Sequence, residues 1–250
     1  MVDVFDEVEE GLRGERWKTL AKTWLPWAAG ALVLVLLIVI GVWAYGNWQD
    51  GRTARASVAY DRGLQALQAQ DVSAAQAAFE EAADAGSSAY RAMSLMQQAG
   101  LALQQDDTAR ALELFDEAAR AHRDPHIADL ARLKAAYLAM DTETLDQART
   151  RLTAINAEGR PFAAYANEAL ALLLVQHGQL EQARPILTQL TLGQNVSDGV
   201  RQRAQALSLM IDNGTASAIA DIVERMRDAS AQSAGAAPAA AAAPTAPPAE

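Results

Sequence analysis

The feature that most constrains this chain is a window of 27 residues, positions 23–49, that contains no charged side chain. A helix rises about 1.5 Å per residue, so about 20 apolar residues cross the roughly 30 Å hydrocarbon core of a bilayer. We therefore predict a transmembrane anchor over residues 24–48. Aromatic rings favour the headgroup layers, and they stand at both ends of the stretch: Trp24, Trp27, Trp43, Tyr45 and Trp48.

Two other structures compete with a permanent anchor. A cleaved signal peptide has an apolar run of about 7 to 15 residues and ends in small residues, whereas this run is longer and ends among aromatic ones. A helix buried in a soluble core normally shows a polar face, and this stretch is apolar on every side. We expect a span that stays in the membrane, with Pro26 in its first turn, where a missing N–H costs little.

Flanking charges predict the orientation of the anchor, because the cationic side of a span tends to stay in the cytoplasm. The cationic residues are Arg13, Arg16, Lys18 and Lys22 before the span, and Arg52, Arg55 and Arg62 after it. This bias favours a cytoplasmic N-terminus. Residues 1–23 are then a juxtamembrane helix, either solvated or used for docking, and the rest of the chain is periplasmic in a bacterium with two membranes.

Composition excludes several functions for the part that follows the anchor. The net charge of −10 and the isoelectric point near 4.8 disfavour binding to nucleic acid. The absence of cysteine excludes disulfides, thiolate nucleophiles and cysteine-based zinc or haem sites. Aromatic residues make up only 6% of the chain, and β-branched runs are confined to the anchor. We therefore predict an all-α fold.

A repeat organises this helical part. Ala75, Phe79 and Ala82 give a small-large-small helix face, and Gly63 lies twelve residues before Ala75. The same spacing returns at Ala111, Phe115 and Ala118, at Ala148, Leu152 and Ile155, and at Ala183, Leu187 and Leu190. The large residues are 36, 37 and 35 positions apart, close to the period of about 34 in tetratricopeptide repeats. The alternative is an irregular helical bundle in which this period is accidental.

The repeat sets the expected domain boundaries. Residues 53–229 are predicted to form a tetratricopeptide-like α-solenoid of about four helix pairs, in which two further helices, 198–211 and 215–229, cap the open end. Residues 230–250 are rich in alanine and proline, and we predict a disordered tail there.

The sequence offers no set of catalytic or metal-binding residues. His122 and His126 are four residues apart, but Pro125 between them disrupts the helical face that a zinc pair needs. No phosphate-binding loop, nucleophile elbow or zinc-protease motif is present. We expect no enzyme activity, no cofactor, no metal and no small-molecule substrate.

What remains is a surface for protein partners. In a tetratricopeptide stack the first helix of each pair lines the concave side. Aligning the four pairs places eight apolar or aromatic residues at inward positions, where they would form an adaptable trough for an extended segment or a helix. They are Tyr60, Met93, Met96, Leu133, Tyr137, Met140, Tyr165 and Leu172. The alternative for each is an ordinary place in the core between repeats.

The opening VDVFDEVEEGLRGERW, the single span flanked by tryptophan, the divergent repeats and the lack of cysteine together resemble one family. It is the tetratricopeptide-like ancillary subunit of the bacterial Sec translocon, in its alphaproteobacterial form. The resemblance covers about residues 1–230. It implies a cytoplasmic N-terminus, a periplasmic solenoid, and association with the Sec translocon and a membrane-bound periplasmic chaperone. It carries over no catalytic residues.

These observations predict a membrane-anchored periplasmic scaffold for protein-protein interactions. Two alternatives remain open. The first is a holdase chaperone that itself binds unfolded segments in its trough. The second is an assembly factor for another envelope complex, docked through its N-terminal helix.

Overall fold

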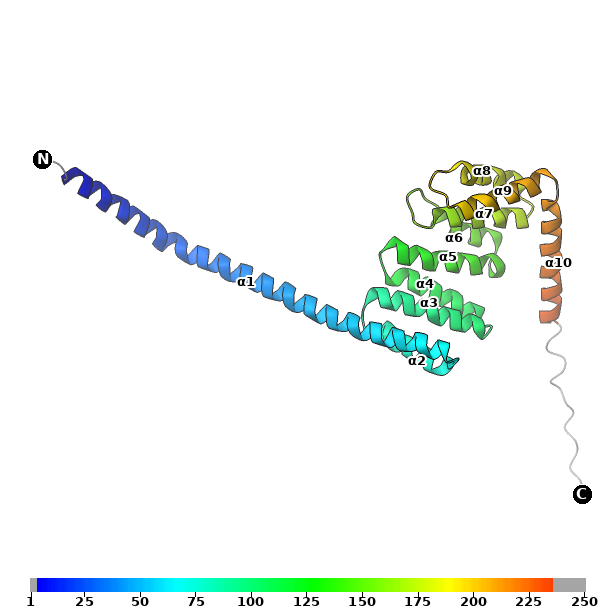
Figure 1. Ribbon diagram of the computed structural model, residues 1–250, viewed down its shortest axis with the longest axis horizontal. Coiled ribbons are helices and arrows are strands. Elements are labelled where there is room, and N and C mark those ends of the chain that lie inside the picture. The colour runs from blue at the N-terminus through cyan, green and yellow to red at the C-terminus, as the bar shows by residue number, and fades with distance from the viewer. Residues whose placement is uncertain (1–3, 236–250) are drawn as a thin grey trace, which may run out of the picture. The chain divides into compact units, whose positions relative to one another are not determined.

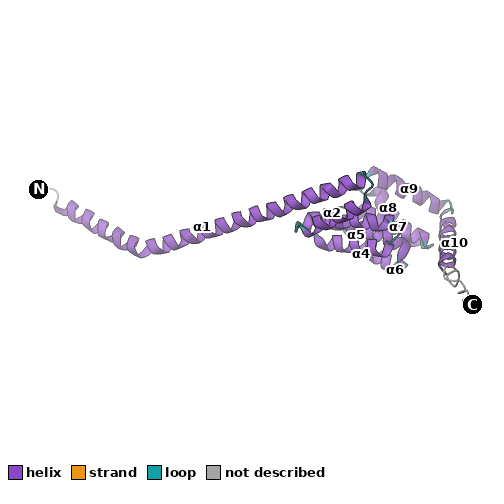
Figure 2. Ribbon diagram, turned by 90° about the horizontal axis from the view of Figure 1, so that it is seen from below, coloured by secondary structure: helices purple, strands orange, loops and turns teal. Residues whose placement is uncertain are grey.

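The computed structural model describes residues 4–235, and the regular elements in this part of the chain are all α-helices (Figures 1 and 2). The all-α prediction is therefore confirmed. The helices are α1 (Val4–Gln68), α2 (Val72–Asp84), α3 (Ser88–Gln104), α4 (Thr108–Ala121), α5 (Pro125–Thr142), α6 (Leu145–Thr153), α7 (Ala163–Gln176), α8 (Leu180–Leu192), α9 (Asp198–Asp212) and α10 (Ala216–Gly235). By its contacts the chain divides into two compact units, residues 1–55 and 56–250.

The charge-free window lies inside α1, and the segment Gly30–Gln68 of α1 is long and apolar enough to cross a membrane. The large apolar side chains of α1 between Trp27 and Trp48 are exposed, among them Trp27 at 78% and Trp43 at 71%. Such a surface is unfavourable in water, so the helix is a candidate membrane span. Pro26 lies in the interior of α1, not in a first turn as predicted, because the helix begins at Val4. The side chain of Trp24 lies outside the described residues.

Polar and aromatic side chains meet at the end of the apolar stretch. The guanidinium carbon of Arg52 lies 4.4 Å from the ring centroid of Trp48, and the Tyr45 ring centroid is 6.1 Å from that of Trp48. A cation over an indole ring and an aromatic belt are both typical of a membrane-water boundary.

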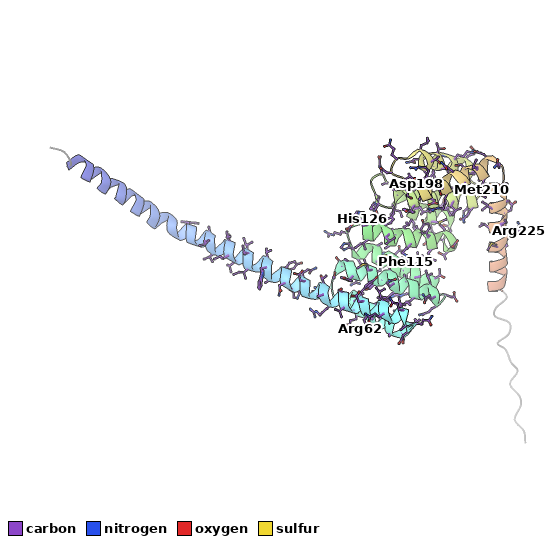
Figure 3. The ribbon with its side chains drawn as sticks, viewed as in Figure 1. Arg62, Phe115, His126, Asp198, Met210 and Arg225 are labelled. Atoms are coloured by element: carbon purple, nitrogen blue, oxygen red, sulfur yellow. The ribbon has the colours of Figure 1, made fainter. Side chains whose placement is uncertain are left out.

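In the second unit the helices stack in the order of the repeat, and all twelve residues of the predicted small-large-small faces are buried. Phe79 and Leu152 are fully buried, and Phe115 lies inside the stack (Figure 3). Second helices pack between the first helices on either side: α2 contacts α3, α4 contacts α3 and α5, and α8 contacts α7 and α9. The small residues allow this close approach, and the large one fills the groove. The repeat prediction is confirmed.

The core consists of three clusters arranged along the stack. Ala75, Phe79 and Leu101 form the first, residues of α3, α4 and α5 the second, and residues of α5 to α10 the third. This division is expected of a solenoid, in which each unit contacts only its neighbours.

Helices α2, α4, α5 and α6 begin at side-chain caps. The carboxylates of Asp71 and Asp107 accept hydrogen bonds from the backbone N–H groups of Ala74 and Arg110, both at 3.0 Å. In the third pair α5 continues to Thr142, and the cap of α6 is Thr144. Thr144 forms a reciprocal capping box with Gln147, a stronger start signal than an isolated Asp or Thr.

The last helix departs from the repeat. In both views α10 runs across the direction of the stacked helices instead of antiparallel to α9 (Figures 1 and 2), and it contacts α7 as well as α9. It also continues to Gly235, past the predicted start of the tail at residue 230. The reason is that residues 230–234 are alanine, serine and glutamine, which are good or neutral helix formers, and no glycine or proline occurs in α10 before Gly235. Residues 236–250 lie outside the described residues.

Candidate partner-binding surface

The eight residues predicted to line the concave side all lie on first helices of the pairs. Tyr60 is on α1, Met93 and Met96 are on α3, three residues are on α5 and two on α7. These helices form one layer, because α3 contacts α5, α5 contacts α7 and α7 contacts α9. The alignment of the repeats therefore places the predicted residues in the same layer.

Burial divides these residues into two groups. Leu133 and Met140 are only 4% and 6% exposed and belong to the core cluster of α5 to α10. They are therefore core residues, and no partner reaches them without a rearrangement. Tyr60 is half-buried between two rings, with centroids 5.5 Å from Phe79 and 5.8 Å from Tyr90.

The accessible part of the predicted surface lies on α5 and α7. Tyr137 is 42% exposed, Tyr165 36% and Leu172 37%. Met93 and Met96, on α3, are half-buried. Two tyrosines and a leucine on neighbouring inner helices form an amphipathic contact surface, since each tyrosine offers an apolar ring and a hydroxyl group.

Charged neighbours complete this surface. Burial raises the pKa of Tyr137, the carboxylate of Glu168 raises it further, and the guanidinium of Arg203 opposes both effects. Arg203 on α9 forms a two-point ion pair with Glu168 on α7, through Nη2 to Oε2 at 2.8 Å and through Nε to Oε1. The surface thus continues from α5 across α7 to α9.

Sequence reasoning missed Glu168 and Arg203. The spacing of 35 residues between them matches the repeat period and was the available signal. This spacing was overlooked because α9 was predicted to be a capping helix and was therefore left out of the alignment of the inner helices. A similar ion pair joins Arg62 and Glu81 near the start of the stack, at 2.7 Å.

A buried carboxylate fixes the spacing of α5 and the segment that leads into α7. Asp129 is fully buried, and its Oδ1 accepts a hydrogen bond from Arg132 Nη1 at 2.7 Å. Arg160, in the connection between α6 and α7, donates to both oxygens, with Nε 2.8 Å from Oδ2. Burial alone raises the pKa of Asp129, but the hydrogen bonds and charges of the two arginines outweigh it and hold the pKa below its ordinary value.

The histidines and carboxylates of the described residues do not converge on a metal site. Among the described residues, no three His, Asp or Glu side chains are placed to hold a metal ion. His122 ends α4, outside the helix that carries His126, and its Nδ1 lies 2.9 Å from the hydroxyl oxygen of Ser88. Beside the exposed tyrosines, Glu168 and Arg203 are engaged with each other in an ion pair.

Stacked antiparallel helix pairs with small-large-small faces define an α-solenoid, a class of repeat protein that presents extended binding surfaces. The family model of the tetratricopeptide repeat-like domain matches residues 18–189. This match covers more than half of the chain, which therefore belongs to the tetratricopeptide repeat-like family. Such repeats typically act as non-enzymatic scaffolds for protein partners. No curated protein and no solved structure matches the chain.

Proposed function

We propose that the chain is a membrane-anchored scaffold that binds protein partners through the exposed inner surface of α5, α7 and α9. The observation that carries this proposal is the exposure of Tyr137, Tyr165 and Leu172 on neighbouring inner helices, beside the ion pair of Glu168 and Arg203 that joins α7 to α9. The exposed apolar stretch of α1 supports the anchor.

The proposed partners are subunits of the Sec translocon and a membrane-bound periplasmic chaperone. The support is the resemblance carried by the opening residues VDVFDEVEEGLRGERW and by the single tryptophan-flanked span. The family match agrees with a protein partner without naming one. In this role the scaffold brings a chaperone close to the channel exit, and weak contacts through span and solenoid reinforce each other.

A crosslinking pull-down tests the proposal with the full-length protein. Tagged protein is crosslinked in membranes, solubilised in mild detergent and analysed by mass spectrometry. The test variant replaces Tyr137, Tyr165 and Leu172 by alanine. The control variant replaces Leu192 and Met226, which are 77% and 68% exposed on α8 and α10, by alanine. We expect to recover translocon and chaperone subunits with the wild type and with the control variant, and to lose them with the test variant. Recovery of only other envelope complexes refutes the proposed partners.

The proposed periplasmic location has a separate test, because the chain contains no cysteine. Single cysteines are introduced by Thr19→Cys before the span and by Gln202→Cys on the exposed face of α9. In intact spheroplasts a membrane-impermeant maleimide should label only the cysteine at position 202. Labelling only at position 19 shows the opposite orientation.

The exposed tyrosines also favour a second candidate, a holdase that binds unfolded chains directly. Full-length protein in detergent would then suppress aggregation of a chemically unfolded test protein, and the triple alanine variant would not. Partner recovery without suppression of aggregation favours the scaffold, and the reverse result favours the holdase.

A further inference from the structure

A second candidate site lies mainly on α4 and α6, the second helices of two neighbouring pairs. A cavity of about 210 Å³ is lined by Asp116, Ala119 and Arg120 of α4, Arg132 of α5, and Arg151 and Ala154 at the end of α6. Three arginines thus line one cavity with a single carboxylate. The chain as a whole has the opposite balance, with 31 acidic residues against 21 basic ones.

The three arginines differ in how far their donors are used. Arg151 is saturated: its Nη1 lies 2.8 Å from Asp116 Oδ1, and its Nε and Nη2 donate to both oxygens of Glu143. Arg132 donates through Nη1 to the buried Asp129, and no described residue accepts a hydrogen bond from its Nε or Nη2. Arg120 forms no hydrogen bond or ion pair with any described residue.

The electrostatics of the cavity favour an additional anion. Guanidinium groups at close range repel one another. Asp116 and Glu143 pair with Arg151, and Asp129 is shared between Arg132 and Arg160, so with Arg120 the group has four guanidiniums against three carboxylates. The C-terminal ends of α4 and α6 supply only partial negative charge. The full charge of Arg120 and the unused donors of Arg132 remain, and they match the planar, two-point geometry of a carboxylate.

We propose that this cavity binds an acidic side chain, Asp or Glu, from a segment of a partner protein. The cavity already contains this type of contact, because Asp116 accepts two hydrogen bonds from Arg151 at 2.8 and 3.0 Å. Its size suits one carboxylate-bearing side chain. The cavity is lined by other residues than Tyr137, Tyr165 and Leu172, so it adds a contact to the inner surface and does not depend on it. Figure 3 labels His126 at the start of α5, the helix that carries Arg132.

The test uses full-length protein in nanodiscs of neutral phosphatidylcholine and a fluorescent octaglutamate peptide, with octaglutamine as the uncharged probe. Arg120→Gln removes the unpaired guanidinium without breaking any contact among the described residues. The matched control is Arg225→Gln, which removes the same charge from exposed α10, where the Nε of Arg225 only donates to the backbone oxygen of Asp221.

We expect octaglutamate to bind and octaglutamine not to bind. Arg120→Gln should weaken binding about tenfold, the loss of one charge-assisted contact, and Arg225→Gln less than about twofold. Arg120→Lys should give an intermediate loss, because an ammonium group keeps the charge but not the two-point geometry. Added salt should weaken the wild type more than Arg120→Gln.

Three results overturn the proposal. The first is no binding of octaglutamate to the wild type. The second is equal weakening by the substitutions at positions 120 and 225, which shows that only net charge matters. The third is Arg120-dependent binding of phosphatidylglycerol vesicles without binding of the peptide, which assigns the cavity to a lipid phosphate instead of a protein.

Discussion

The contact between α1 and α2 allows a sharp test of the packing argument. Gly63 on α1 faces the fully buried ring of Phe79 on α2. A Cβ atom at position 63 would lie 2.6, 2.7 and 2.9 Å from three carbons of that ring. Carbon atoms pack at about 3.5–4.0 Å, so Gly63→Ala forces the helices or the ring to move by about 1 Å.

Two effects of opposite sign decide the size of the change. Overpacking a well-filled core costs about 1–3 kcal/mol. Alanine in place of glycine inside a helix gains up to about 1 kcal/mol. Gly100→Ala isolates the second effect, because Gly100 lies within α3 and a Cβ atom there meets nothing within 4 Å. The free energies of unfolding of the two variants should therefore differ by about 1–3 kcal/mol, with Gly100→Ala the more stable.

Urea and thermal unfolding of the full-length protein in detergent, followed by circular dichroism, measure this difference. For a domain of this size 1 kcal/mol corresponds to about 2–4 °C in Tm. Phe79→Leu in the Gly63→Ala background should cost less than Phe79→Leu alone, because the smaller side chain relieves the clash. Equal stabilisation by Gly63→Ala and Gly100→Ala, or additive effects at positions 63 and 79, refutes the packing argument.

Three further predictions concern the buried carboxylate and the inner surface. Asp129→Asn should lower the free energy of unfolding in urea by about 1.5–3 kcal/mol, the size of a hydrogen bond to a charged group, and less if water reaches the partly exposed arginines. Since the pKa of Asp129 is held below 3.8 in the folded state, its carboxylate stabilises the protein at neutral pH. This contribution is lost as the pH falls through 3.8 and below, so wild type and Asp129→Asn should converge in acid. Leu133→Ala should lower the free energy of unfolding by about 2–5 kcal/mol, whereas Tyr165→Ala should lower it by less than about 1 kcal/mol and weaken recovery of partners.

The sequence was sufficient to predict the repeat, because the repeat is a regular pattern of small and large side chains. Ala75 and Ala82 are small and allow neighbouring helices to approach, and Phe79 is large and fills the groove between them. All three are buried. Gly63 was identified twelve residues upstream by the same pattern, and the structure shows that a larger residue clashes there. Short-range volume patterns of this kind need no knowledge of the rest of the fold.

Sequence analysis was less successful where the outcome depends on contacts with distant residues. Leu133 and Tyr137 occupy the same face of α5, one turn apart, yet one is buried and the other 42% exposed. Their burial depends on α7 and on the helices beyond it, which periodicity does not place. The cavity with Arg120 was also missed, because its arginines come from three helices and none of them is unusual in its own segment.

The division of the core into three clusters implies that the two ends of the solenoid are energetically separable. Phe79 belongs to the first cluster and Leu133 to the third, and they are connected only through the α3, α4 and α5 contacts of the second. In a stack of this kind, stability is approximately a sum of terms for each unit and its neighbours. A change at Gly63 therefore perturbs the first pair and leaves the exposed tyrosines of α5 and α7 in place. Partner binding and the packing of the first pair should then vary independently. If one variant, such as Gly63→Ala, both destabilises the first pair and loses its partners, the partner also contacts α1 to α3.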